Sequence, residues 1–159
     1  MNYKTGIGID IHKLISGSSM KLGGVDIKSS KRIDAHSDGD IIYHSLSDAI
    51  LGSLGEGDIG EHFPDNLSST LNMDSAIILS HVFSLMQKEK FSINNADIVL
   101  MLENPKILDY KVEMRNNIST ILHCDTKLIN IKATTTEKLG FIGREEGIAC
   151  YSIVSIIKQ

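Results

Sequence analysis

The sequence of 159 residues contains no tryptophan, two prolines and two cysteines. Cys124 and Cys150 show no CxxC spacing and do not indicate a disulfide framework, so we expect a reducing compartment. No apolar run approaches the ~18 residues of a membrane span. A strand pattern begins within a few residues of Met1, which leaves no room for a signal or transit peptide. We therefore expect a cytoplasmic protein without a membrane partner.

Positive charge is also scarce, with 16 Lys and Arg residues against 20 Asp and Glu residues and a net charge of −4. A nucleic-acid partner is not expected, because binding one would need a basic face. An anionic substrate would need local neutralisation by metals, helix N-termini or individual Lys and Arg side chains. Hydrophobic residues make up 42% and charged residues 23%, as in ordinary folded proteins, and the length suits one domain spanning residues 1–159.

Residues 6–12 alternate between isoleucine and other residue types, which predicts a β-strand with one buried face. We expect the isoleucines to anchor this strand in the core. Gly6, Gly8, Asp10 and His12 then share the other face. Asp10 and His12 would lie about 7 Å apart along the strand, at ~3.4 Å of rise per residue.

The remaining periodicity predicts an α+β fold. Helical spacing covers residues 39–53, 73–88 and 107–123, and strand-like runs cover residues 20–27, 91–102, 127–134 and 148–158. Ser37 or Asp38 is the expected N-cap of the first helix. Residues 54–70 form a long glycine-punctuated loop, and loops of this length are usually functional. The order of elements predicts one sheet with helices on one face.

Three side chains are candidate metal ligands. Asp10 and His12 share a strand face, and His44 lies on the first predicted helix. Two nitrogens and a carboxylate suit Zn²⁺ with a fourth position left open. Asp48, one turn after His44, is positioned to accept the imidazole N–H and fix the ring. The alternative is a solvated strand end and a surface His–Asp contact, and spacing alone does not show that residues 12 and 44 meet.

A second candidate site begins at Thr134. Consecutive hydroxyls and backbone N–H groups of Thr134, Thr135 and Thr136 can hold phosphate oxygens, and Glu137 can hold Mg²⁺. The alternative is a strand end rich in threonine, which is a good strand former. Two loop segments, residues 58–60 and 105–106, can bind a sugar hydroxyl and a base or phosphate, although solvated loop residues are the commoner case.

Several longer motifs occur together and in order. They are Gly-Ile-Asp-Ile-His at 8–12, Ala-His-Ser-Asp-Gly-Asp at 35–40 with His44, Gly-Asp-Ile-Gly at 57–60 with Phe-Pro-Asp at 63–65, and the runs at 132–141 and 143–149. Through them the chain resembles the 2-C-methyl-D-erythritol 2,4-cyclodiphosphate synthase family nearly end to end. The resemblance implies a two-layer α/β sandwich built on one mixed sheet. It also implies a homotrimer with active sites between subunits and an apolar channel on the threefold axis.

The family's activity is the conversion of 4-diphosphocytidyl-2-C-methyl-D-erythritol 2-phosphate to the cyclic diphosphate with release of CMP. This phosphorus–oxygen lyase reaction belongs to the non-mevalonate route to isoprenoids. The implied partner is therefore a cytidine diphosphate-linked small molecule. Because the attack is intramolecular, the protein would position and neutralise the substrate and supply no nucleophile. Zinc would polarise a phosphate oxygen, while magnesium would bridge the α- and β-phosphates.

The resemblance also assigns roles to residues. Asp10, His12 and His44 would hold zinc or manganese, Glu137 would hold magnesium, and His36 and Thr135 would stabilise transition-state charge. The expected substrate contacts are Ser37, Asp58, Ile59, Gly60, Phe63, Pro64, Asp65, Leu102, Pro105, Lys106, Ile107, Leu108, Thr134, Thr136, Glu137, Phe141 and Arg144.

Some expectations depend on how closely the chain follows the family. Gly6 and Gly8 would keep their strand edge open for the substrate's phosphates. The side chains at 103 and 104 would be free to vary if the base is read by backbone groups. Leu67 replaces an Asp that the family often has, which removes one polar contact.

Two other functions are alternatives to the enzyme activity. They are a nucleotide- and metal-binding regulatory protein without turnover, and a structural trimer module.

Overall fold

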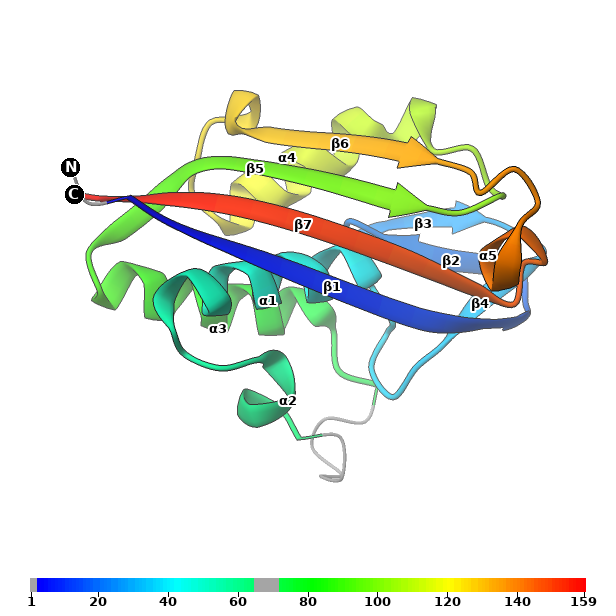
Figure 1. Cartoon of the computed structure of the whole chain (residues 1–159), viewed down its shortest axis with the longest axis horizontal. Coiled ribbons are helices and arrows are strands. Elements are labelled where there is room, and N and C mark those ends of the chain that lie inside the picture. The colour runs from blue at the N-terminus through cyan, green and yellow to red at the C-terminus, as the bar shows by residue number, and fades with distance from the viewer. Residues whose placement is uncertain (1–2, 65–71) are drawn as a thin grey trace.

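A five-stranded mixed sheet forms one layer of the molecule (Figure 1). The computed structural model describes residues 3–64 and 72–159, so Asp65 and Leu67 lie outside the described residues. The strands of this sheet are β1 (Tyr3–Ser16), β4 (Lys31–Asp34), β5 (Phe91–Met101), β6 (Ile129–Thr134) and β7 (Gly147–Lys158). They lie in the order β4-β1-β7-β5-β6, and β5 and β6 run parallel while the other neighbours run antiparallel.

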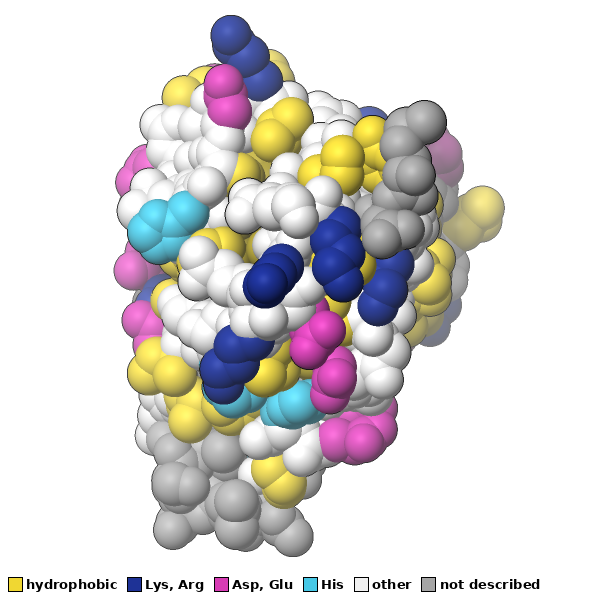
Figure 2. Space-filling view, turned by 90° about the vertical axis from the view of Figure 1, so that its left-hand side faces the viewer, with side chains coloured by type: hydrophobic (Ala, Val, Ile, Leu, Met, Phe, Trp, Pro, Cys, Tyr) yellow, Lys and Arg dark blue, Asp and Glu magenta, His cyan; other side chains and the backbone are white. Residues whose placement is uncertain are grey.

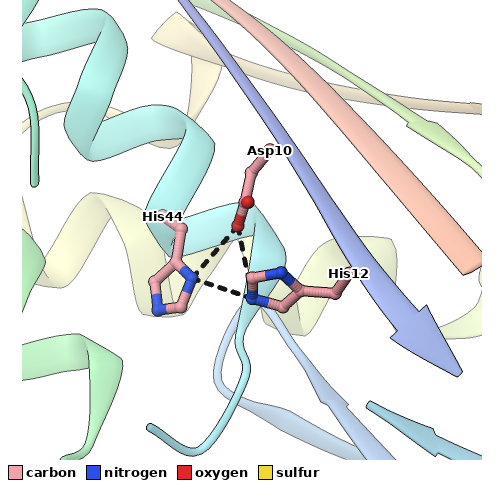
Figure 3. Close-up of side chains that lie close together, drawn as sticks. All are labelled: Asp10, His12 and His44. Carbon is pink, nitrogen blue, oxygen red and sulfur yellow. Dashed lines mark hydrogen bonds and ion pairs between the residues drawn. The ribbon is translucent and has the colours of Figure 1, made fainter. Parts of the chain in front are cut away.

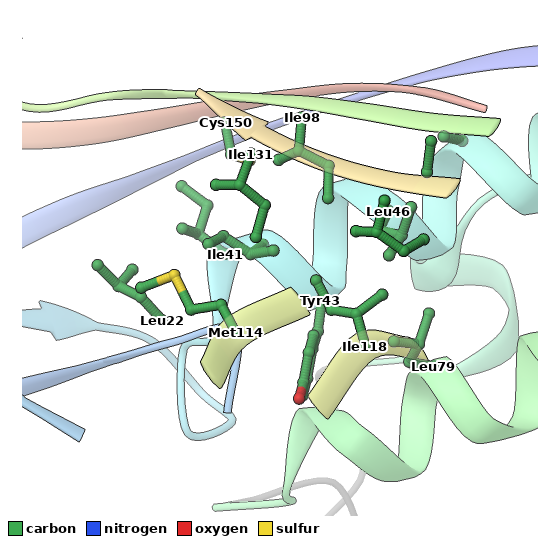
Figure 4. Close-up of a cluster of buried hydrophobic side chains, with 14 of the residues drawn as sticks. Leu22, Ile41, Tyr43, Leu46, Leu79, Ile98, Met114, Ile118, Ile131 and Cys150 are labelled. Atoms are coloured by element: carbon green, nitrogen blue, oxygen red, sulfur yellow. The ribbon is translucent and has the colours of Figure 1, made fainter. Parts of the chain in front are cut away.

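Three long helices cover one face of this sheet, with the core between the two layers (Figure 4). They are α1 (Ile41–Leu54), α3 (Ser75–Lys88) and α4 (Lys111–Ile121), and the short helices are α2 (Ile59–His62), α5 (Gly140–Gly143), η2 (Leu108–Tyr110) and η3 (Thr126–Leu128). Within the two described ranges, no helix is long and apolar enough to cross a bilayer. The predicted α+β fold, with a mixed sheet and helices on one face, is confirmed.

The segment 20–27 is a hairpin and not the single interrupted strand that its pattern predicts. β2 (Ser19–Leu22) pairs with β3 (Val25–Lys28) around Gly23 and Gly24. Both glycines have positive φ, 58° and 75°, as a two-residue hairpin turn with right-handed strand twist requires. The hairpin packs beside the start of α1, through contacts of Gly23 and Gly24 with the helix N-cap.

Helix α1 begins one turn before His44. Its N-cap is Asp40 and not Ser37 or Asp38 as predicted, because the Asp40 carboxylate accepts from the backbone N–H of Ile42 and Tyr43 at 3.2 and 3.3 Å. The same carboxylate accepts from the N–H groups of Gly23 and Gly24 at 2.9 and 2.6 Å. Burial raises the pKa of Asp40. This one side chain therefore ties the start of α1 to the β2–β3 hairpin.

The isoleucines of β1 face away from the core, contrary to prediction. Ile7, Ile9 and Ile11 are 60%, 50% and 55% exposed. The helices cover the opposite face of β1, which carries Gly6 and Gly8. The predicted alternation is therefore correct, but the prediction of which face is buried is wrong. The outward stripe continues onto β7, where Tyr151 pairs with Ile9 and Ile153 pairs with Ile7. A continuous apolar patch of this kind usually marks an interface.

The glycines of β1 serve helix packing and do not open the strand for phosphates. A Cβ atom on Gly8 would fall inside van der Waals distance of Ser45 O and 2.7 Å from Ala49 N, and one on Gly6 would reach 2.5 Å from Ser53 N. These are backbone atoms of α1. The two glycines therefore let α1 lie against the strand, which brings His44 close to Asp10.

Gly8→Ala is expected to lower the free energy of unfolding by about 3 kcal/mol, since overpacking against backbone cannot be relieved by a side-chain rotation. Urea unfolding measures the change. Gly52→Ala is the matched control, because the nearest atom to its Cβ is Ile7 O at 3.8 Å and the position is helical. That variant should be neutral or more stable by up to ~1 kcal/mol. Equal stabilities for the two variants would contradict this packing account.

The end of the molecule that carries both termini shows interspersed basic and acidic side chains (Figure 2). Lys4 and Lys158 lie over the ring of Phe91, with their Nζ atoms 5.0 and 5.3 Å from its centroid. Mixed charge of this kind does not form the continuous basic face that nucleic-acid binding requires.

Candidate active site

Asp10 and His12 of β1 meet His44 of α1 on the helix-covered side of the sheet (Figure 3). Asp10 Oδ2 lies 3.1 Å from His44 Nδ1 and 3.4 Å from His12 Nε2, and the two nitrogens are 3.2 Å apart. The three ligand atoms lie within 4.8 Å of one another. The prediction that these three side chains group together is confirmed.

The hydrogen bonds of the two imidazoles fit a cation between them. His12 Nδ1 lies 3.0 Å from Ile11 O, a group that can only accept, so Nδ1 carries the proton and Nε2 of the neutral ring offers a lone pair. His44 Nε2 likewise has a hydrogen-bond partner, Ser75 Oγ, so the other ring nitrogen, Nδ1, is the one that faces Asp10. Two nitrogen lone pairs and a carboxylate this close would repel one another without a cation. The donor set suits Zn²⁺ and also accepts Mn²⁺.

Asp48 does not orient His44, contrary to prediction. Asp48 Oδ1 accepts from Ile59 N at 2.8 Å and so holds the start of α2. The contacts of His44 Nε2 are Ser75 Oγ at 2.8 Å and Ser37 Oγ at 3.2 Å. Ser75 lies 31 residues from His44 at the start of α3, and no local sequence pattern marks it.

A cavity of about 440 Å³ opens over the three ligands, a size typical of small-molecule sites. Its wall brings together residues from β1, the segment before α1, α1 itself, residues 59–64 and the stretch from Met73 into α3. Besides the ligands, the predicted site residues that line it are His36, Ser37, Ile59, Gly60, Phe63 and Pro64. Asp58 is the N-cap of α2, and its carboxylate accepts from Glu61 N at 3.0 Å. It does not line this cavity.

A second, smaller cavity of about 90 Å³ lies at the carboxyl ends of β5 and β6. These strands are parallel neighbours, so the segments that follow them meet at one edge of the sheet. The predicted site residues that line this cavity are Leu102, Pro105, Lys106, Ile107, Thr134 and Thr135. Leu108 points to solvent and is 73% exposed. Of the two loop segments singled out in the sequence, residues 105–106 thus share this cavity with the Thr134 segment, while Ile59 and Gly60 of the other segment line the first cavity.

Glu103 braces this second cavity, so its side chain is not free to vary as the sequence suggested. Only 4% of the side chain is exposed, and its carboxylate accepts from Thr136 N at 3.0 Å and Lys138 N at 3.3 Å. The Lys138 ammonium, 3.0 Å away, is the main cause that lowers the pKa of Glu103 to about 2. Glu137 and Lys138 have left-handed φ values of 53° and 65°, so Glu103 holds an unusual turn in place.

The two cavities are separate within one chain. β1 and β6 are three positions apart in the sheet order, which is about 14 Å at ~4.8 Å per strand. Thr136 bonds Glu103, and Thr135 Oγ1 lies 3.3 Å from Glu137 Oε1. The fold of a single chain does not bring Thr135 or Thr136 to the Asp10–His12–His44 group.

Phe141 and Arg144 belong to the segment around α5. The Arg144 guanidinium pairs with the Glu146 carboxylate at 2.8 and 3.0 Å. Phe141 is partly exposed. Neither residue lines the two cavities.

The comparisons with known proteins agree along nearly the whole chain. The model of the YgbB family matches residues 3–157. A 2-C-methyl-D-erythritol 2,4-cyclodiphosphate synthase of Chlorobium phaeobacteroides is 48% identical over 153 residues, 96% of this chain and 97% of the relative. The synthase of Fusobacterium nucleatum is 43% identical over 156 residues, 98% of both chains. IspF of Plasmodium falciparum, solved as a CDP complex, has a TM-score of 0.88 and 40% identity over 99% of this chain and 97% of its own. The chain therefore belongs to the YgbB family, as a member of the 2-C-methyl-D-erythritol 2,4-cyclodiphosphate synthases.

Proposed function

We propose that this chain converts 4-diphosphocytidyl-2-C-methyl-D-erythritol 2-phosphate into 2-C-methyl-D-erythritol 2,4-cyclodiphosphate and CMP. The observation that carries the proposal is the convergence of Asp10, His12 and His44 under a cavity in a chain of this family. The CDP complex of the Plasmodium falciparum relative supports a cytidine diphosphate-linked substrate.

Two ions belong to the proposal. Asp10, His12 and His44 would hold Zn²⁺ or Mn²⁺, and Glu137 would hold Mg²⁺ at the diphosphate. When bound, these ions supply Lewis-acid charge to the phosphate oxygens.

The chain itself positions an intramolecular displacement. An oxygen of the substrate's 2-phosphate bonds to the β-phosphorus, and the bond from that phosphorus to the bridging oxygen breaks, so that CMP leaves with the electron pair. His36 and Ser37, on the cavity wall, would bind the reacting phosphates. Thr135, on the wall of the second cavity, would donate hydrogen bonds to the diphosphate as charge develops. Holding both ends of one molecule in line accounts for much of the acceleration.

The remaining contacts follow the family pattern. Asp58, Ile59 and Gly60 would bind the ribose, and the segment 102–108 with Pro105, Lys106, Ile107 and Leu108 would bind the cytosine. The diphosphate would meet Thr134, Thr136 and Glu137, and the erythritol side would meet Phe63, Pro64, Asp65, Phe141 and Arg144. A single domain over residues 1–159 is part of the proposal, supported by one buried cluster that joins the sheet to α1, α3 and α4.

A homotrimer would unite the two cavities. The exposed apolar stripe on β1 and β7 supports packing against other copies around a threefold axis. Because the two cavities are about three strands apart in one chain, the diphosphate residues of one subunit would complete the metal-ligand cavity of the next.

The test is to incubate the purified protein with the substrate, Zn²⁺ and Mg²⁺ and to follow CMP and the cyclic diphosphate. We expect equal amounts of both products, and none after chelation of the metals. Binding of CDP without CMP release would instead support the regulatory alternative and contradict the proposal.

A further inference from the structure

Behind His44, on the side away from Asp10, a chain of polar contacts leads to Lys21. His44 Nε2 lies 2.8 Å from Ser75 Oγ, Ser75 Oγ bonds Asp38 Oδ1, and Asp38 Oδ2 lies 3.1 Å from Lys21 Nζ. The four residues come from α1, the start of α3, the segment before α1 and strand β2. Ser75 is fully buried. The sequence predicts Asp38 only as a candidate helix N-cap, and no motif contains Ser75 or Lys21.

The chemistry of these groups sets the direction of every hydrogen bond. Asp38 accepts from Ser75 N at 3.2 Å and Asp40 N at 3.3 Å, and a carboxylate beside an ammonium can only accept. The Ser75 hydroxyl therefore donates to Asp38, and its oxygen must accept from His44 Nε2–H. The neutral His44 ring then carries its lone pair on Nδ1, the atom that lies 3.1 Å from Asp10 Oδ2.

We infer that Ser75 and Asp38 are positioning residues that hold His44 in its Nε2-protonated tautomer and aim Nδ1 at the metal position. Lys21 keeps Asp38 in its accepting state. Partners of this kind fix the orientation and basicity of histidine ligands. The inference deepens the proposed function and depends on its metal site.

Other observations support this arrangement. Burial raises the pKa of Asp38, but hydrogen bonds from Ser75, Asp40 and Lys21 more than offset it and hold that pKa below its usual value. Ser75 is the first residue of α3 after the N-cap Asp74, which accepts from Ala76 N at 2.9 Å, so the helix start fixes its hydroxyl. Ser37 Oγ, the other contact of His44 Nε2, accepts from Gly39 N at 3.2 Å and lines the cavity, where the proposed substrate would compete for it.

The test measures Zn²⁺ affinity by competition with a chelator, without any substrate. Ser75→Ala is expected to weaken binding about 10-fold, in line with other losses of such partners. Lys21→Met, which leaves the buried contacts in place, should weaken it in the same direction by a smaller factor. Ser80→Ala is the matched control on the same helix. The exposed Ser80 hydroxyl donates to Ala76 O and reaches neither His44 nor Asp38, so this variant should bind Zn²⁺ as the wild type does.

A second measurement reports the tautomer directly. Nitrogen-15 NMR of the metal-free protein should show His44 protonated at Nε2 in the wild type and as a mixture of tautomers in Ser75→Ala. Circular dichroism verifies that each variant is folded. If the wild type fails to bind one Zn²⁺ per chain, the metal site of the proposed function falls, and this inference falls with it. If the wild type binds Zn²⁺ while Ser75→Ala and Lys21→Met match its affinity and the His44 tautomer is unchanged, only the positioning role is overturned.

Discussion

Asp10→Ala is expected to lower the rate of CMP release roughly 1,000-fold and to abolish Zn²⁺ binding, while the protein stays folded. Asp10 is the one anionic ligand of the group and contacts both imidazoles. Losing a bound Lewis acid removes several kcal/mol of transition-state stabilisation, and 1.36 kcal/mol is a factor of ten. Turnover and metal content of the same preparations provide the measurement.

Asp34→Ala is the control for Asp10→Ala. Asp34 also lies on the sheet, but among the described residues its carboxylate makes only a long surface pair with Lys13, at 3.8 Å. Such a pair contributes little to stability or function. Turnover close to the wild-type rate in Asp10→Ala would show that the ligand assignment is wrong.

Ile9→Glu is expected to convert the assembly to monomers and to abolish CMP release. Ile9 is half exposed in the single chain, so a glutamate there is solvated in the monomer and the fold tolerates it. In a threefold interface the same carboxylates would be buried close together, which is strongly unfavourable. Light scattering after gel filtration gives the oligomeric state, and the CMP assay gives the activity.

Ile77→Glu is the matched control for the interface. Ile77 is a similarly exposed isoleucine on α3, away from the β1–β7 stripe. This variant should keep the wild-type assembly and rate. A fully active monomer, whether of Ile9→Glu or of the wild type, would contradict a site shared between subunits.

The motifs were sufficient to predict the family, the mixed sheet and the grouping of Asp10, His12 and His44. They could not predict which side of β1 is buried. Alternation of isoleucine with glycine is the same pattern whichever face the helices cover, and only the close approach of α1 to Gly6 and Gly8 decides it.

The residues that the sequence missed act through distant contacts. Ser75 reaches His44 across 31 residues, Glu103 reaches Thr136 and Lys138 across 33 and 35, and Asp40 reaches Gly23 and Gly24 across 17 and 16. A polar residue in such a role has no periodicity or local spacing to mark it. Tertiary packing alone brings these partners together.

Mixed assemblies of two inactive variants test the shared site most directly. Asp10→Ala lacks a ligand of the first metal and Glu137→Ala lacks the carboxylate proposed to hold Mg²⁺ at the substrate's diphosphate, so each variant alone should be inactive. When the two are co-expressed in equal amounts, random threefold assembly places a subunit with intact Asp10 beside a subunit with intact Glu137, in the orientation that forms a site, at about a quarter of the interfaces. The predicted result is CMP release at about a quarter of the wild-type rate. Verified mixed assemblies that remain inactive would contradict the proposal that each site is built from two subunits.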